Sequence, residues 1–364
     1  MPKKYRHYGW ECSPYSTKTR SYFRYKQIPF DDIHPTAIEI KFIMEKRVGF
    51  TIMPVVIAPQ GHTLQDSSEI IDAVESAHPA RPVFPVPPKQ RLISYLFELY
   101  GDEWLPIISM TTRWTIPANK AFAFEEFGHC AFPFLPRALT TPLGKKIGAK
   151  LNSYLPVLGI TEKTKPQIHL WLAELLTQLD THFSEHPFLL GSQPCLGDFA
   201  FHGPLYSHVW RDPASRHLIE AHPHLNAWRE RMMHPANVMG SFLDNDEIPP
   251  TLWPILQRMF KEQHPVLIKS VQQIQNYLDE NPNPKRFPRS LGKVRFQIGG
   301  VEEERTLTTF PIWKMQRAFN FYQSLDVKEK ENVDTLLSEV GGQEYMQTEI
   351  TFKLVRNNFK VQVA

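Results

Sequence analysis

Residues 5–30 constrain the fold more than any other part of the chain. A short aromatic run ends at Gly9, Cys12 and Ser13 follow, and the sequence turns basic and aromatic after Pro14. Proline is tolerated in the first helical turn, where its missing N–H would have no partner, so this order predicts a strand, a short loop and a helix. A helix N-terminus offers free N–H groups and a partial positive charge to a thiolate or another anion. Ser13 is therefore either part of an anion site or only an N-cap, and these residues alone favour neither.

A proline also interrupts the apolar run over residues 50–57, FTIMPVVI. The run reads as a buried strand, but a proline removes a ladder hydrogen bond and is awkward inside a central strand. A cis bond between Met53 and Pro54 at the start of the strand would resolve this conflict.

Polar residues open the next helix, which we expect after a hairpin turn over residues 58–63. Asp66, Ser67 and Glu69 come just before or among apolar residues at helical spacing. Such a helix start is again suited to an anion, although the same residue types serve as caps.

These three features together resemble the cytosolic glutathione transferase superfamily. A thiol or hydroxyl before Pro14, the strand-breaking Pro54, and the pair Asp66 and Ser67 follow in that family's order with suitable gaps. The similarity covers roughly residues 4–78, the family's thioredoxin-like domain.

The resemblance implies specific roles at the glutathione site. Pro54 would be cis, and the backbone of Val55 would pair with the cysteinyl part of glutathione. Asp66 would accept from the γ-glutamyl ammonium, while donors around Ser67 receive the carboxylate. Glutathione would then be the co-substrate.

Three residues compete to activate the glutathione sulfur. The sequence SPYSTK resembles the SPxxxK start of bacterial members with a serine, which places Ser13 first. Cys12 falls one residue before the thiol of cysteine-type members, and Tyr8 lies near the tyrosine of other classes. A neutral hydroxyl that donates to the sulfur favours the thiolate and lowers its pKa. Tyr8 as a core strand residue and Cys12 as a small buried hydrophobe remain open alternatives.

The rest of the chain predicts two further regions. Residues 76–88 are proline-rich and suit a stiff linker, and leucines at helical spacing follow. We expect an α+β protein: a thioredoxin-like α/β domain over residues 1–80, an all-helical domain over 89–245, and an extension of helices and hairpins over 246–364. The extension contains no catalytic constellation that we recognise.

We expect residues 101–114 to lie on one long helix. By the resemblance it would line the electrophile pocket and the domain interface. Trp104, Arg113 and Trp114 are candidates for either position, and packing is the simpler role for each tryptophan.

Composition limits the partners. A net charge of +3 is too small to suggest nucleic acid or an anionic membrane, and no apolar run approaches the roughly 20 residues that span a bilayer. Three cysteines at unrelated spacings and fifteen histidines without zinc-enzyme spacing predict neither a disulfide framework nor a metal site. We expect a cytoplasmic protein and, by the resemblance, a homodimer, although the extension could cover the usual interface.

Three functions follow from these patterns. The first is a glutathione transferase of the detoxification type, in which Ser13 stabilises the thiolate for attack on a hydrophobic electrophile between the domains. The second is thiol transfer with Cys12 as the nucleophile. The third is a transferase-like fold kept as a binding or regulatory module, with the extension as its interaction surface.

Overall fold

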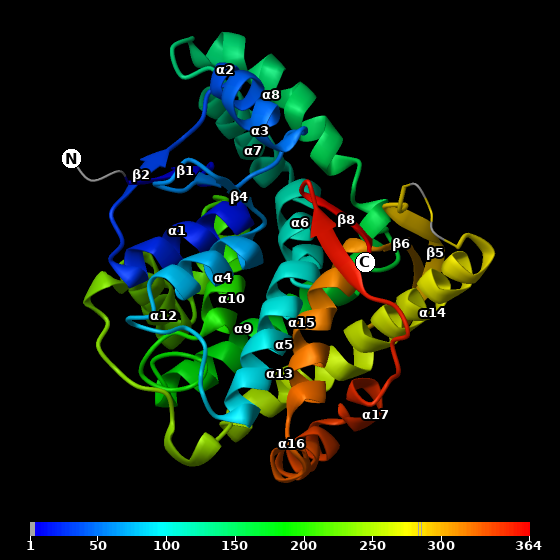
Figure 1. Ribbon diagram of the computed structural model, residues 1–364. Helices are drawn as coiled ribbons and strands as arrows, with labels where there is room; N and C mark the ends of the chain where they lie inside the picture. Colours follow the sequence, from blue (N-terminus) through cyan, green and yellow to red (C-terminus); the bar gives the residue numbers. More distant parts are fainter. Residues whose placement is uncertain (1–3, 283, 285) are drawn as a thin grey trace.

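The computed structural model describes residues 4–282, 284 and 286–364 (Figure 1). The N-terminal region is built on a sheet with the strand order β2-β1-β3-β4. β1 pairs parallel with β2 and antiparallel with β3, and β3 pairs antiparallel with β4. The strands are β1 (Tyr5–Tyr8), β2 (Phe30–Ile33), β3 (Val55–Ile57) and β4 (Thr63–Gln65).

Helices cover both faces of this sheet, with α1 and α4 below it and α2 and α3 above it in Figure 1. The predicted strand, loop and helix at the N-terminus are confirmed. The helical segments are α1 (Pro14–Lys26), α2 (Ala37–Glu39), η1 (Ile40–Met44), α3 (Glu45–Val48) and α4 (Ser67–Ala77).

The predicted cis bond between Met53 and Pro54 is present. The strand expected over residues 50–57 is shorter than predicted, because pairing starts only at Val55. Pro54 has no N–H to offer a neighbouring strand, so the ladder begins after it.

The second region is helical, as predicted. Its helices are α5 (Pro88–Glu103), α6 (Pro106–Thr115), α7 (Pro117–Ala131), α8 (Arg137–Asn152), α9 (Lys165–Glu185), α10 (Leu196–Pro204), η3 (Leu205–Trp210), α11 (Arg216–Glu220) and α12 (Pro223–Met233). The prediction of one helix over residues 101–114 is wrong. α5 ends at Glu103 and α6 starts anew at Pro106, because a proline fits the first turn of a helix but not its interior.

The extension has the predicted mixture of helices and two hairpins. Its longer elements are α13 (Trp253–Arg258), η7 (Met259–Gln263), α14 (His264–Glu280), β5 (Ser290–Ile298), β6 (Val301–Thr308), α15 (Phe310–Ser324), α16 (Val327–Val340), α17 (Gln343–Met346), β7 (Leu354–Asn357) and β8 (Lys360–Val363). Gly341, in the left-handed conformation with φ 75°, ends α16. No helix in the described ranges is both long and apolar enough to cross a membrane.

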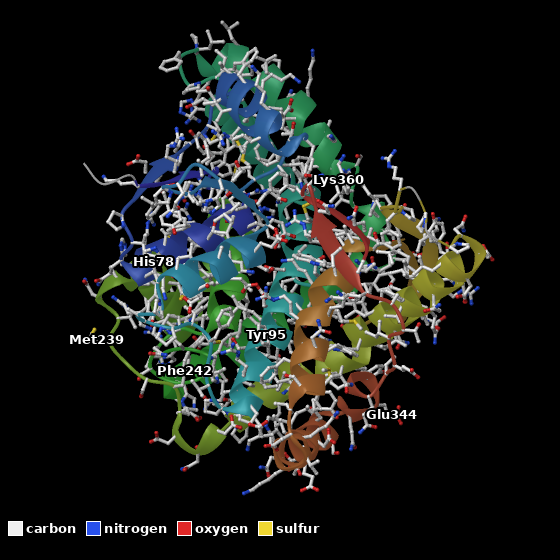
Figure 2. All side chains as sticks on the ribbon, viewed as in Figure 1. His78, Tyr95, Met239, Phe242, Glu344 and Lys360 are labelled. Carbon is white, nitrogen blue, oxygen red and sulfur yellow. The ribbon has the colours of Figure 1, made fainter. Side chains whose placement is uncertain are left out.

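The extension packs along α5 and continues the core of the other regions. α15 runs beside α5 in Figure 1, and the ring of Tyr95 on α5, labelled in Figure 2, lies 5.8 Å from that of Phe321. Ile71 of α4, Leu96 of α5 and Met315 of α15 belong to one buried cluster. The extension is therefore joined to both preceding regions through a shared hydrophobic core.

Candidate functional site

The sheet register brings the predicted site segments to one end of the sheet. Tyr8, the last residue of β1, pairs with Val55 at the start of β3, and Val55 pairs with Gln65 at the end of β4. α1 follows β1 and α4 follows β4, so both helices begin at this end. The two helix N-termini and the cis-proline loop thus lie around the same region.

Ser13 caps α1 at this end. Its Oγ accepts a hydrogen bond from the backbone N–H of Ser16 at 3.3 Å, and the residue is half-buried. The cap uses an acceptor position of the hydroxyl, so its O–H can still donate to another group. Both readings of Ser13, as a cap and as a sulfur contact, are therefore compatible.

Cys12 is buried, with Cys130 beside its thiol and Arg113 bound to its carbonyl. A hydrogen bond involving the Cys130 thiol lowers the pKa of Cys12, burial raises it, and the nearby Arg113 lowers it again, with a net decrease. Hydrogen bonding and burial raise the pKa of Cys130. Arg113 donates to the Cys12 carbonyl at 2.9 Å and pairs with the buried Asp212 at 2.6 Å. Arg113 therefore joins α6 to the loop before α1. The sequence analysis offered Arg113 for either the electrophile pocket or the domain interface, and this contact corresponds to the second position.

Tyr8 belongs to a small hydrophobic core. It is 3% exposed and clusters with Met44, Val48 and Val55. Trp104 and Trp114 are also buried, at 1% and 3% exposure, as the packing interpretation expected.

Val55 lies in a strand with neighbours on both sides. β3 pairs with β1 on one edge and β4 on the other, so within the described sheet Val55 has no open edge for a peptide ligand. Met53 precedes the cis bond and the first ladder pair. Its backbone, which the sequence analysis did not consider, therefore lies outside the pairs of this ladder.

Asp66 forms the N-cap of α4 in an uncommon conformation. Its carboxylate accepts from the N–H of Ser68 at 2.8 Å, and its φ is +77°, a region that non-glycine residues rarely adopt. Such strain is concentrated at functional sites. Ser67 is 1% exposed, and its hydroxyl has no hydrogen-bond partner among the residues described.

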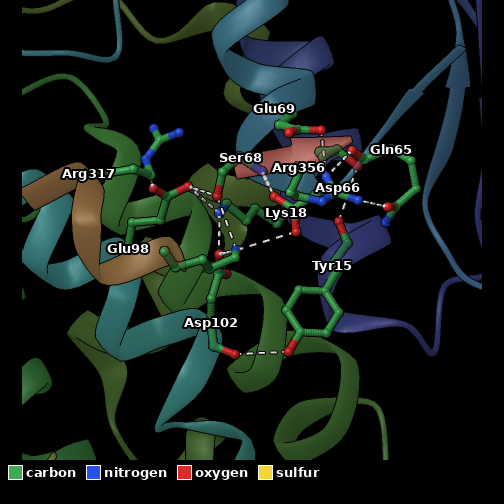
Figure 3. A network of polar contacts seen from close by, with 12 residues as sticks. Tyr15, Lys18, Gln65, Asp66, Ser68, Glu69, Glu98, Asp102, Arg317 and Arg356 are labelled. Atoms are coloured by element: carbon green, nitrogen blue, oxygen red, sulfur yellow. Dashed lines mark hydrogen bonds and ion pairs between the residues drawn. The ribbon is translucent and has the colours of Figure 1, made fainter. Parts of the chain in front are cut away.

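A lysine from the extension occupies the space beside Asp66. Nζ of Lys314, on α15, lies 3.7 Å from Asp66 Oδ2 and 3.1 Å from Ser68 Oγ, and pairs with Asp102 of α5. The Lys314 side chain is 2% exposed. Figure 3 shows these acceptors converging between α4, α5 and the extension.

The same network contains Lys18 of the SPYSTK motif. Its Nζ lies 2.6 Å from Glu98 and 2.7 Å from Asp102. Arg317, one turn after Lys314, reaches Glu98 at 3.0 Å and pairs with Asp72. The motif lysine therefore ties α1 to α5, and the extension binds the same carboxylates from the other side.

The terminal hairpin adds a third cation from the extension. Nη1 of Arg356, on β7, donates to the Gln65 carbonyl at 2.8 Å and to Glu69 at 2.5 Å, and Nη2 bonds the Gln65 side chain. The Arg356 side chain is 3% exposed, and its Nε has no partner among the described residues. Arg356 thus contacts residues on both sides of Ser67.

The charged groups of the network shift one another's pKa values. Burial raises the pKa of Asp66, but Lys314 and Arg356 lower it further, to below its ordinary value. Burial lowers the pKa of Lys314, but the carboxylates of Asp102 and Asp66 raise it to above its ordinary value. Burial raises the pKa of Glu103 to about 8. At neutral pH the centre of the network therefore holds ionised Asp66 and protonated Lys314 together.

The three extension cations were missed by sequence reasoning. Lys314, Arg317 and Arg356 lie more than 200 residues from the carboxylates that they meet. The one sequence signal was a pair of cations at helical spacing, Lys314 and Arg317, among apolar residues of the predicted helix.

One other group has the residue types of a metal site. Atoms of Glu11, Asp32 and His34 lie within 4.8 Å of one another. Arg20 already pairs with Asp32 at 2.7 Å and with Glu11 at 3.3 Å, so its charge occupies the position a cation would take.

The chain has a thioredoxin-like domain followed by a helical domain, and both domains match known protein families. The sequence profile of the glutathione S-transferase N-terminal domain matches residues 8–82, and that of the glutathione S-transferase C-terminal domain matches residues 162–235. The chain therefore contains the N-terminal and C-terminal domains of the glutathione S-transferase family. Neither match reaches the extension.

The solved structures that match this chain include a glutathione S-transferase from Rhodospirillum rubrum, at 14% identity over 68% of this chain and 96% of that one, with a TM-score of 0.42. A glutathione S-transferase from Methylobacterium radiotolerans, in complex with glutathione sulfonate, shows 19% identity over 68% and 100% of the chains, with a TM-score of 0.41. The beta-etherase LigF from Sphingobium shows 17% identity over 63% and 94%, with a TM-score of 0.44. No curated protein matches the chain significantly.

Proposed function

We propose that this protein binds glutathione at the end of the sheet described above and activates its sulfur with Ser13. The observation that carries the proposal is the convergence of the α1 N-terminus, the cis-proline loop and the α4 N-terminus. Ser13 retains a donor for the sulfur, the backbone of Met53 takes the cysteinyl contact first expected of Val55, and Asp66 with Ser67 faces the γ-glutamyl end.

The chemistry follows from the position of the sulfur. The Ser13 hydroxyl and the positive end of α1 both favour the thiolate over the thiol and so lower its pKa. The thiolate then donates an electron pair to an electrophilic carbon, forming a sulfur–carbon bond as a leaving group departs with its own pair. The protein lowers the pKa of the thiol, so that its proton passes to water, and it positions the thiolate against a hydrophobic electrophile.

The test is conjugation of glutathione to chlorodinitrobenzene by the full chain. Ser13→Ala should lower kcat/KM on the order of 10²-fold, as expected for the loss of one preorganised donor. Ser13→Thr, which keeps a hydroxyl, is the matched control and should retain most activity. Equal activity of wild type and Ser13→Ala would refute the role of Ser13.

A second enzymatic function uses Cys12, whose pKa is lowered beside Cys130. In that case Cys12→Ser would abolish reduction of a mixed glutathione disulfide, while Ser13→Ala would leave it intact. The burial of Cys12, at 4% exposure, favours the Ser13 function over this one.

A non-catalytic function is favoured by a different observation. The extension already places Lys314 and Arg356 against the residues expected to hold the γ-glutamyl group. A transferase fold retained as a binding module would bind no glutathione in a calorimeter, or would bind it without turning over any electrophile.

A further inference from the structure

The structure contains one ammonium site at the start of α4, and the chain itself fills it. Lys314 Nζ donates hydrogen bonds to Ser68 Oγ and Asp102, and it lies 3.7 Å from Asp66 Oδ2, at the distance of an ion pair. Under the proposed function, Asp66 is also the residue that would receive the ammonium of glutathione.

We infer that Lys314 determines ligand specificity by supplying this ammonium from the protein, so that the site favours a thiol whose acidic end carries a carboxylate but no α-ammonium group. This inference rests on the proposed function. A ligand ammonium beside Asp66 would face the like charge of Lys314, and Lys314 would have to give up its acceptors to admit it.

Lys314 cannot easily move away, because α15 is firmly docked. Ile312, Met315 and Tyr322 of that helix are each fully buried. Arg317, one turn further, is held by Asp72 and Glu98. Displacing Lys314 by shifting α15 would expose this apolar face and break these ion pairs.

The carboxylate end of such a ligand still finds donors. The Ser67 hydroxyl and Nε of Arg356 are both buried, and neither has a hydrogen-bond partner among the described residues. Arg356 contacts Gln65 and Glu69, on either side of Ser67. Two unpartnered donors near a helix N-terminus favour an anion, and a carboxylate accepts from both kinds of donor.

The test compares glutathione with glutaryl-cysteinyl-glycine, the same molecule without its α-amino group, by isothermal calorimetry on the full chain. Wild type should bind the amine-free analogue at least about tenfold more tightly than glutathione. A tenfold difference in affinity requires only a modest difference in binding free energy. Lys314→Met should reverse the preference, because the ammonium of glutathione then replaces the missing charge. Lys328→Met, which removes an exposed lysine of α16, is the matched control and should behave like wild type.

A second variant guards against misfolding of Lys314→Met. Lys314→Met combined with Asp102→Asn removes one charge of each sign from the network, and it should lose the preference for the amine-free analogue. The inference is overturned if wild type prefers glutathione, or if the preference is the same in wild type and in both Lys314 variants. Glutathione binding by wild type with such an unchanged preference would leave the proposed function standing. Failure of both ligands to bind any variant would overturn the proposed function and the inference together.

Discussion

Replacing Lys314 with methionine should destabilise the fold strongly. The Lys314 ammonium is 2% exposed and neutralises Asp66 and Asp102, which are themselves buried. Removing one partner of a buried ion pair costs about 3–5 kcal/mol, because the remaining charge loses its compensation in a low dielectric. Lys18 still pairs with Asp102, so Asp66 is the carboxylate that loses its nearest cation. Total stabilities are about 5–15 kcal/mol, so the loss is a large share of the whole.

The assay is urea unfolding followed by tryptophan fluorescence, with the midpoint and slope compared between variants. The control is Lys41→Met, because Lys41 makes an exposed ion pair with Glu45 and has a side chain 69% exposed. That variant should change stability by less than about 1 kcal/mol. Combining Lys314→Met with Asp102→Asn should recover part of the loss, because one charge of each sign is then removed and Lys18 keeps Glu98 as its partner. A loss below about 1 kcal/mol for Lys314→Met would refute the view that this buried network stabilises the fold.

Three other predictions test the structure. The fold lowers the pKa values of Asp66 and Glu98, so these carboxylates stabilise the fold at a pH above their ordinary pKa values, and the stabilisation is lost as the pH falls. The free energy of unfolding should therefore decrease below about pH 4, and it should decrease less steeply in Lys314→Met. Arg113→Ala should cost about 3–5 kcal/mol in urea unfolding because Asp212 loses its buried partner, whereas Arg137→Ala, at an exposed pair, should cost under about 1 kcal/mol. Light scattering should show a homodimer, the assembly expected from the family, and a monomeric mass at micromolar concentration would contradict it.

The features that the sequence predicted well depend on near neighbours. The cap of Ser13 on α1 and the cis bond before Pro54 each follow from residues a few positions apart. The break between α5 and α6 was equally local, but the aromatic and charged residues before Pro106 obscured it. The surroundings of Val55 are not local, since only the strand order shows that both edges of its strand are paired.

The contacts with the extension could not be predicted from local patterns. Asp66 and Ser67 were identified by their position at a helix start, yet the partner of Asp66 is a lysine on α15. Nothing in the sequence around Lys314 or Arg356 indicates which carboxylate each would meet, because that depends on how α15 and the last hairpin pack on α5 and β4. Long-range ion pairs of this kind are set by tertiary structure alone.

A crystal structure of the full chain with glutathione bound tests the central claim most directly. We expect the glutathione sulfur within hydrogen-bond distance of Ser13 Oγ at the N-terminus of α1, with the Met53 backbone beside the cysteinyl group. A sulfur beside Cys12 or Tyr8 instead, or glutathione bound away from this end of the sheet, would contradict it.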